Sequence, residues 1–155
     1  MSKIHLIDFE FDHDYDLIGI HSVLADYRMA YFLNDYLDIQ LRRFKDDLDF
    51  ESKNCSFPLY KFEDKTAFTS WSLIANKFVF TENVTEGGSN LFLEETKISY
   101  LIPEKKKVDY FIKITGLKDT VELSTALSNI NKISNIMASY AIDPMDLKSR
   151  DNLIF

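Results

Sequence analysis

The stretch LIPEKKKVDYFIKI, residues 101–114, places three consecutive lysines between two apolar runs. The flanking segments 98–103 and 108–114 are rich in β-branched and aromatic residues, which is typical of strands. The stretch therefore predicts a β-hairpin in which residues 104–107 form the connection. Because side chains alternate between the faces of a strand, four residues of the second strand are expected to share one face: Val108, Tyr110, Ile112 and Ile114.

Apolar periodicity predicts two helices elsewhere in the chain. The first is expected to follow an N-cap at Ser22 and to run to about Leu37. Its apolar arc comprises Val23, Leu24, Tyr27, Ala30, Tyr31 and Leu37. The second is expected to begin at Asp119 and to run to about Lys132, because Glu122 three residues after Asp119 completes a pattern that resembles a capping box.

The remaining segments have the alternation or the apolar content of strands. Extended segments are expected at 4–21, with a turn at 12–14, and at 39–44, 57–64, 66–80, around 90–95, and 133–142. Residues 45–54 are expected to form a charged loop, and 86–89 a turn. The order predicts an α+β fold, with an antiparallel sheet of about six to eight strands and two main helices packed on one face. The whole chain, 1–155, is expected to form a single globular domain.

Charge and composition restrict the classes of partner. The 155-residue chain has a formal net charge of −7 and a pI near 4.9. Nucleic acids and anionic membranes both attract a basic face, so neither is expected as a partner. Residues 1–16 do not have the pattern of a signal peptide, and no run approaches the roughly 18 apolar residues of a membrane span. We therefore expect a soluble cytoplasmic protein; a homo-oligomer is compatible with the sequence.

The opening stretch also carries a family resemblance. Ile102-Pro103-Glu104, three variable residues and then Val108-Asp109-Tyr110 reproduce the defining pattern of the IPExxxVDY family. The chain resembles that family of small bacterial proteins, found chiefly in Bacteroidota, and its segments 21–34 and 147–155 look similar as well. The resemblance implies one family domain, and it implies no reaction or ligand.

Carboxylates occupy alternate positions in the N-terminal segment: Asp8, Glu10, Asp12, Asp14 and Asp16. An EF-hand loop counted from Asp12 needs Gly at its sixth position and a carboxylate at its twelfth, where Leu17 and Val23 stand. The EF-hand is therefore excluded. A solvated acidic face is the favoured interpretation, and an irregular cation site is the alternative.

No other pattern indicates catalysis or a cofactor. His5, His13 and His21 lack the spacing of a zinc site. Cys55, the only cysteine, has only Lys53 as a nearby basic residue in the sequence, which does not indicate a reactive thiol. P-loop, dinucleotide and G-x-S-x-G motifs are missing. The sequence therefore predicts no catalytic residue, no metal ligand and no cofactor.

Three features are candidates for a binding surface. Asn34 lies in the apolar arc of the first predicted helix, where its amide either bonds a neighbouring strand or loop or lines a groove. Trp71 is expected to pack in the sheet, and would anchor a partner if exposed. Lys105, Lys106 and Lys107 either solvate the hairpin tip or contact an acidic partner.

These features favour a non-enzymatic interaction or regulatory module with an aromatic contact surface and an unknown protein partner. The alternative is a small-molecule binding domain with a pocket between sheet and helices.

Overall fold

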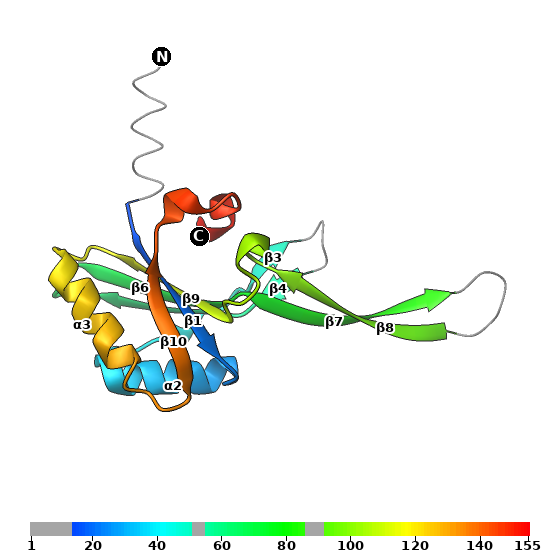
Figure 1. Cartoon of the computed structure of the whole chain (residues 1–155), viewed down its shortest axis with the longest axis horizontal. Helices are drawn as coiled ribbons and strands as arrows, with labels where there is room; N and C mark the ends of the chain where they lie inside the picture. The colour runs from blue at the N-terminus through cyan, green and yellow to red at the C-terminus, as the bar shows by residue number, and fades with distance from the viewer. Residues whose placement is uncertain (1–13, 51–54, 86–91) are drawn as a thin grey trace, which may run out of the picture.

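The computed structural model describes residues 14–50, 55–85 and 92–155 (Figure 1). Within these ranges the main sheet has six antiparallel strands in the order β10-β1-β9-β6-β5-β2. Its strands are β1 (Asp16–Ser22), β2 (Arg42–Arg43), β5 (Leu59–Asp64), β6 (Thr69–Ala75), β9 (Tyr110–Thr115) and β10 (Ile136–Ile142). The helices α2 (Asp26–Leu37) and α3 (Thr120–Ile130) share one hydrophobic core on one face of this sheet. The predicted α+β fold is confirmed.

Two further strand pairs lie outside the main sheet. They are β3 (Leu48–Phe50) with β4 (Cys55–Phe57), and β7 (Lys77–Thr85) with β8 (Phe92–Tyr100). The predicted loop over 45–54 therefore contains a strand, and the strand predicted over 39–44 is reduced to β2. The expected extended segment 4–13, with its carboxylates and with His5 and His13, lies outside the described residues.

Both faces of the main sheet are covered by hydrophobic side chains. The core on the helix side includes Ile18, Leu73, Ile112, Met29, Leu33 and Ile130. The core on the opposite side includes Leu17, Ile74, Phe111, Leu101, Ile102, Leu147 and Leu153. The C-terminal helices η3 (Pro144–Asp146) and η4 (Arg150–Leu153), red in Figure 1, lie away from α2 and contribute Leu153 to this second core.

The predicted hairpin between 98–103 and 108–114 is wrong. Strand β8 pairs with β7, whereas β9 lies between β1 and β6. The reason is that β9 is apolar on both faces, with Phe111 and Ile112 both at 0% exposure, so it requires an interior position. The helix η2 (Pro103–Lys105) lies in the connection that carries the chain from β8 into the main sheet.

Two details of the strand predictions also change. The segment predicted as one strand over 66–80 is divided into β6 and β7 by Asn76. Tyr110, Ile112 and Ile114 share one face as predicted, and this face belongs to the core on the helix side. Val108 precedes β9 and belongs to the opposite core instead.

Helix α2 begins later than predicted and buries a different face. Ser22 ends β1, where its hydroxyl accepts a hydrogen bond from the Leu24 N–H at 3.2 Å, and the N-cap is Ala25. The buried residues are Met29, Ala30 and Leu33. Tyr27 and Tyr31 are 66% and 67% exposed, so the predicted apolar arc is wrong at both tyrosines.

Helix α3 follows its prediction closely. The Asp119 carboxylate accepts a hydrogen bond from the Glu122 N–H at 3.0 Å, as in a capping box. The Glu122 carboxylate accepts in turn from the Lys118 N–H at 2.8 Å, one residue before the N-cap. Ala126 and Ile130 are buried on one side of the helix.

The corrected faces give a first testable prediction. Ile112→Ala is expected to lower the free energy of unfolding by about 2–5 kcal/mol, because Ile112 is fully buried between sheet and helices. Tyr27→Ala is expected to change it by no more than about 0.5 kcal/mol, because the ring is exposed. Urea denaturation measures both, and equal losses would contradict the exposed position of Tyr27.

Candidate functional site

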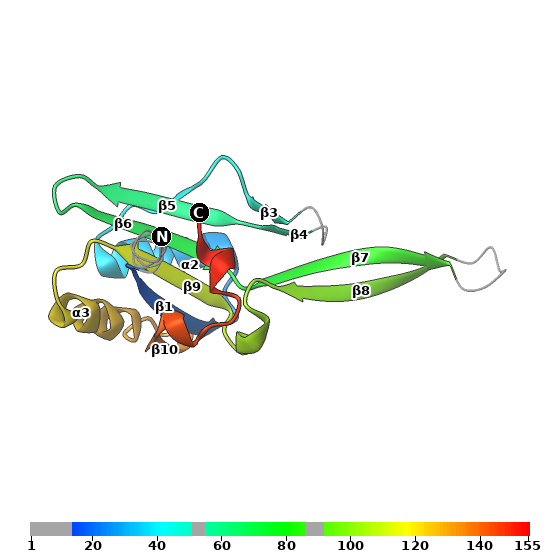
Figure 2. The ribbon, with the colours of Figure 1, turned by 90° about the horizontal axis from the view of Figure 1, so that it is seen from above.

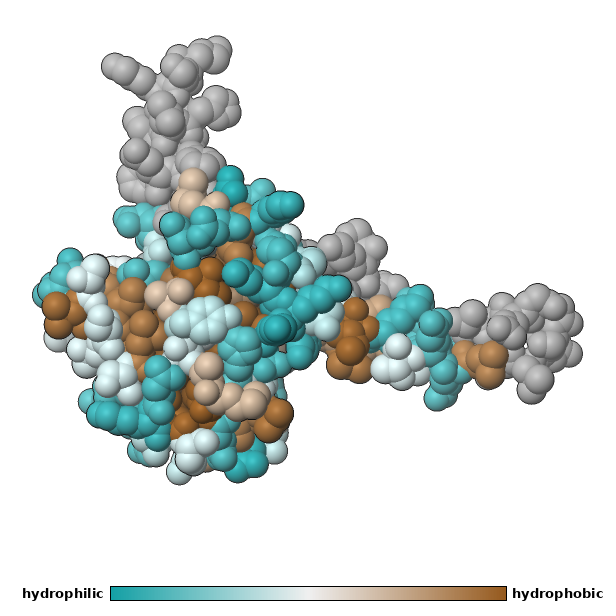
Figure 3. Space-filling model, in the orientation of Figure 1, coloured by the Kyte–Doolittle hydropathy of each residue, from teal (hydrophilic) through white to brown (hydrophobic). Residues whose placement is uncertain are grey.

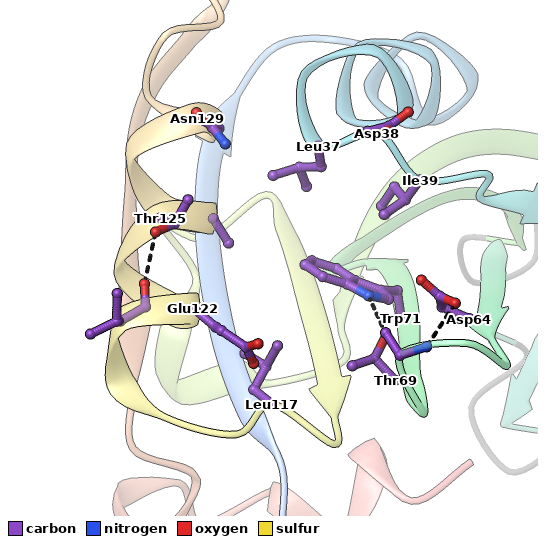
Figure 4. Close-up of a pocket in the computed structure, with 13 residues that line it drawn as sticks. Leu37, Asp38, Ile39, Asp64, Thr69, Trp71, Leu117, Glu122, Thr125 and Asn129 are labelled. Atoms are coloured by element: carbon purple, nitrogen blue, oxygen red, sulfur yellow. Dashed lines mark hydrogen bonds between the residues drawn. The ribbon is translucent and has the colours of Figure 1, made fainter.

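A pocket of about 340 Å³ lies between the C-terminal end of α2, one side of α3 and the strands β5 and β6 (Figure 4). It is lined by Leu37, Asp38, Ile39, Asp64, Ala67, Thr69, Trp71, Leu117, Val121, Glu122, Thr125, Ala126 and Asn129, and we call it the Trp71 pocket. These residues come from three separate segments of the chain, so the tertiary fold assembles the pocket.

The end of α2 supplies one wall of the pocket. Asp38 adopts a left-handed conformation with φ of 54°, and its N–H donates to the Asn34 carbonyl. The Asn34 side chain accepts from the Leu41 N–H at 2.7 Å and donates to the Leu41 carbonyl at 3.1 Å. Asn34 therefore does not line the pocket; it fixes the chain that presents Ile39 to it.

The indole of Trp71 lies in the middle of the labelled pocket residues (Figure 4). Trp71 is buried, with 8% exposure, as the sequence predicted for a packed residue of the sheet. Its Nε1–H donates to Thr69 Oγ1 at 3.3 Å. The neighbouring turn is held by Asp64, whose carboxylate accepts from the N–H groups of Thr66 and Ala67 at 2.9 and 3.0 Å. The ring thus forms an apolar floor with polar groups at its edge.

A second feature is the outer side of α2. Three exposed residues there, Tyr27, Arg28 and Tyr31, lie opposite the buried Met29 and Leu33 when the helix is followed in steps of about 100°. Phe32 borders them and packs partly against the core. We call these four residues the α2 aromatic face: Tyr27, Arg28, Tyr31 and Phe32. The Tyr31 and Phe32 rings meet edge to face at 5.6 Å, and the Arg28 guanidinium lies 6.0 Å from the Phe32 ring centroid. Exposed tyrosines at this density form a surface suited to contact with another protein.

The turn before β9 is held by a residue that the sequence did not single out. The buried Asn76 side chain donates to the carbonyls of Lys105 and Val108, both at 2.8 Å, and accepts from the Ile102 N–H at 2.8 Å. Its backbone N–H also donates to the Asp109 carbonyl at 2.9 Å. The sequence signal that indicates such a residue is an Asn between two apolar, strand-like segments.

The polar residues of the IPExxxVDY pattern connect distant parts of the chain. Glu104 accepts hydrogen bonds from the Ser149 N–H and hydroxyl at 2.7 and 2.9 Å. Burial would raise the pKa of Glu104, but these hydrogen bonds bring it below its ordinary value. Asp109 accepts from the Ser22 N–H at 2.8 Å and pairs with Lys77 at 2.9 Å.

Tyr110 completes these connections. Its hydroxyl donates to the Leu24 carbonyl at 2.6 Å, and burial holds its pKa well above the ordinary value. The pattern residues therefore act in the fold: they tie the turn to β1, to the start of β7 and to the C-terminal segment.

The three lysines lie apart from the Trp71 pocket. Lys105 is half-buried, and its carbonyl accepts the hydrogen bond from Asn76. Lys106 and Lys107 are exposed, and the Lys106 ammonium lies 5.6 Å from the Tyr100 ring centroid. Asn34, Trp71 and the group of three lysines, which are the candidates from the sequence, therefore lie at three separate places in the structure.

The arm formed by β7 and β8 projects from the body of the protein (Figures 1 and 2). Val79 and Ile98 are opposite each other on it and are 60% and 52% exposed. Leu93, nearer the far end, is 51% exposed. Figure 3 shows the hydrophobic residues of the arm as separate groups with polar residues between them, so this view of the arm shows no continuous apolar strip.

No group of three or more His, Cys, Asp and Glu side chains in the described ranges could hold a metal ion. His21 Nε2 lies 2.9 Å from the Tyr140 hydroxyl. None of the helices in the described part of the chain is long and apolar enough to cross a membrane.

Fold and site together define an α+β protein with an open pocket beside its helices and an exposed aromatic helix face. No family model, no curated protein and no solved structure matches this chain.

Proposed function

We propose that the protein is a non-enzymatic cytoplasmic interaction module that binds a partner protein through the α2 aromatic face. The observation that carries the proposal is the gathering of the exposed Tyr27, Arg28 and Tyr31 on the outer side of one helix, with Phe32 at its border. Tyr and Arg are enriched among the residues that dominate binding energy at protein interfaces.

The energetics of α2 support this assignment. Met29 and Leu33 already anchor the helix to the sheet, and the rings of Tyr27 and Tyr31 take no part in this core. A partner that removed these two rings from water would gain the free energy of burying their apolar area. Tyrosine suits such a face because its ring buries apolar area while its hydroxyl stays hydrogen-bonded.

Site-specific photo-cross-linking tests the proposal. A benzophenone amino acid at position 27 or 31 is expected to capture the same partner in the cell that makes the protein, whereas one at position 137 is not. Met137 is a matched control, because it is 71% exposed and lies on β10.

The captured partner then gives a quantitative test. Tyr27→Ser with Tyr31→Ser is expected to weaken its binding at least about tenfold, since tenfold corresponds to only about 1.4 kcal/mol. Met137→Ser is expected to leave the affinity unchanged. Equal capture from all three positions, or unchanged affinity of the double variant, would reject the α2 aromatic face as the contact surface.

A second candidate function is small-molecule binding in the Trp71 pocket. The observation that favours it is the convergence of an aromatic floor and several polar side chains in one hollow of about 340 Å³. Ligand sites commonly combine an apolar lining with a few polar groups in this way. The two functions use different surfaces and can coexist.

We also propose that the chain belongs to the IPExxxVDY family that its sequence resembles. The contacts of Glu104, Asp109 and Tyr110 support the view that this pattern marks a shared fold. They do not point to a shared ligand, because each of these side chains bonds another part of the same chain.

A further inference from the structure

We infer that the Trp71 pocket binds a quaternary ammonium compound, an organic cation with a compact apolar head. The inference rests on the second function proposed above and names the chemical class of its ligand. It follows from the charge, the lining and the size of the pocket.

The charges around the pocket favour a cation. Asp38, Asp64 and Glu122 contribute carboxylates, and no Lys, Arg or His occurs among the described lining residues. The C-terminal end of α2 also lies at the pocket, and its last turn carries no basic residue. The negative end of the α2 dipole therefore adds to the field of the carboxylates, and the acidic Asp119 and Glu122 offset the positive end of α3 at the same pocket.

These carboxylates differ in the number of hydrogen bonds that they accept from other groups of the protein. Asp64 and Glu122 accept hydrogen bonds from backbone N–H groups, which hold them in position. The Asp38 carboxylate forms no hydrogen bond or ion pair with the residues that the structure describes. Lys65 and Lys118 are chain neighbours of the pocket but do not line it. Asp38 is thus the carboxylate most able to face a bound cation.

The apolar part of the lining selects the kind of cation. Leu37, Ile39 and Leu117 would contact a ligand beside the Trp71 indole. Calcium and magnesium require several oxygen ligands in a defined geometry, which this lining does not offer. A quaternary ammonium group carries its charge on methyl groups, and tryptophan is the side chain that binds such a cation best.

The size of the pocket agrees with a small ligand. Ligand sites typically range from about 300 to 1,000 Å³, and this pocket lies at the lower end of that range. Asp38, Val121 and Glu122 are exposed at its edge, so the ligand can enter without movement of a covering segment. A head group of four or five heavy atoms with a short polar tail would fit.

Trp71 is the only tryptophan of the chain, so its fluorescence reports on this pocket directly. The full-length protein is titrated with choline chloride, with ionic strength held constant by sodium chloride. A parallel titration uses 3,3-dimethylbutan-1-ol, which has the same shape without the charge. Choline is expected to change the emission in a saturable manner, and the neutral alcohol to bind at least about tenfold more weakly.

Two variants remove one negative charge each. Asp38→Asn is expected to weaken choline binding at least about threefold, and asparagine tolerates the left-handed conformation of this position. Asp146→Asn, an exposed carboxylate in η3 that does not line the pocket, is expected to leave the affinity unchanged. Equal losses in both variants would show a general charge effect and overturn the inference.

The remaining outcomes separate the inference from the function on which it rests. Equal binding of choline and the alcohol would overturn the ammonium assignment and leave a small-molecule site. No saturable signal from either probe would overturn both. Neither result bears on the α2 aromatic face, which the cross-linking experiment tests separately.

Discussion

Asn76→Ala is expected to lower the free energy of unfolding by about 3–6 kcal/mol. The side chain of Asn76 is fully buried and forms three hydrogen bonds at 2.8 Å with the backbone of Ile102, Lys105 and Val108. Alanine would remove a partner from each of these buried groups, and an unsatisfied buried polar group costs about 1–3 kcal/mol. A domain of ordinary stability, about 5–15 kcal/mol, would lose a large fraction of it.

Urea denaturation measures this effect, with Asn83→Ala as the matched control. Asn83 is exposed on β7, so its replacement is expected to change stability by no more than about 0.5 kcal/mol. Asn76→Asp adds a second test, because the carboxylate would direct an oxygen at the carbonyls of Lys105 and Val108. A stable Asn76→Asp protein would show that this amide does not hold the turn.

The two helices show what local sequence can and cannot determine. The capping pattern at Asp119 and Glu122 predicts the start of α3, since its two hydrogen bonds join residues only three and four positions apart. No such pattern marks α2, whose N-cap Ala25 makes no side-chain hydrogen bond. The predicted apolar arc includes Val23 and Leu24, which precede the helix, and these two residues displace the arc toward Tyr27 and Tyr31. Apolar spacing alone does not distinguish an aromatic ring that packs from one that faces solvent.

The predicted hairpin failed for a different reason. Segments 98–103 and 108–114 are adjacent in sequence and both are strand-like, which favours pairing between neighbours. Asn76 directs β7 out of the main sheet, and β8 then pairs with β7. The separation of β7 from β6 at Asn76 depends on hydrogen bonds between residues about thirty positions apart. A local sequence pattern cannot predict such bonds.

The sequence alone does not predict the Trp71 pocket either. Trp71 and Asn34 were both singled out, yet only Trp71 lines the pocket. Asp38, Asp64 and Glu122 lie far apart in the sequence and share no motif. Their convergence follows from the position of α2 and α3 on the same face of the sheet, which the fold class predicts only in outline.

The last prediction concerns the stretch with the three lysines. Val108→Ser is expected to destabilise the protein by about 3–5 kcal/mol, because it removes two buried methyl groups and places a hydroxyl in the core of Leu17 and Phe111. Replacement of Lys105, Lys106 and Lys107 by Ser is expected to cost no more than about 0.5 kcal/mol per residue. Only the backbone carbonyl of Lys105 joins the network of Asn76, and serine retains that carbonyl.

Denaturant midpoints of the two variants decide between a structural and a binding role for this turn. A folded Val108→Ser protein with an ordinary midpoint would contradict the burial of Val108. A lysine-free variant that folds normally but no longer binds its cellular partner would extend the contact surface to the turn at the base of the arm. Because the side chains of Glu104, Asp109 and Tyr110 bond Ser149, Ser22 and Leu24 of the same chain, we expect the structural outcome.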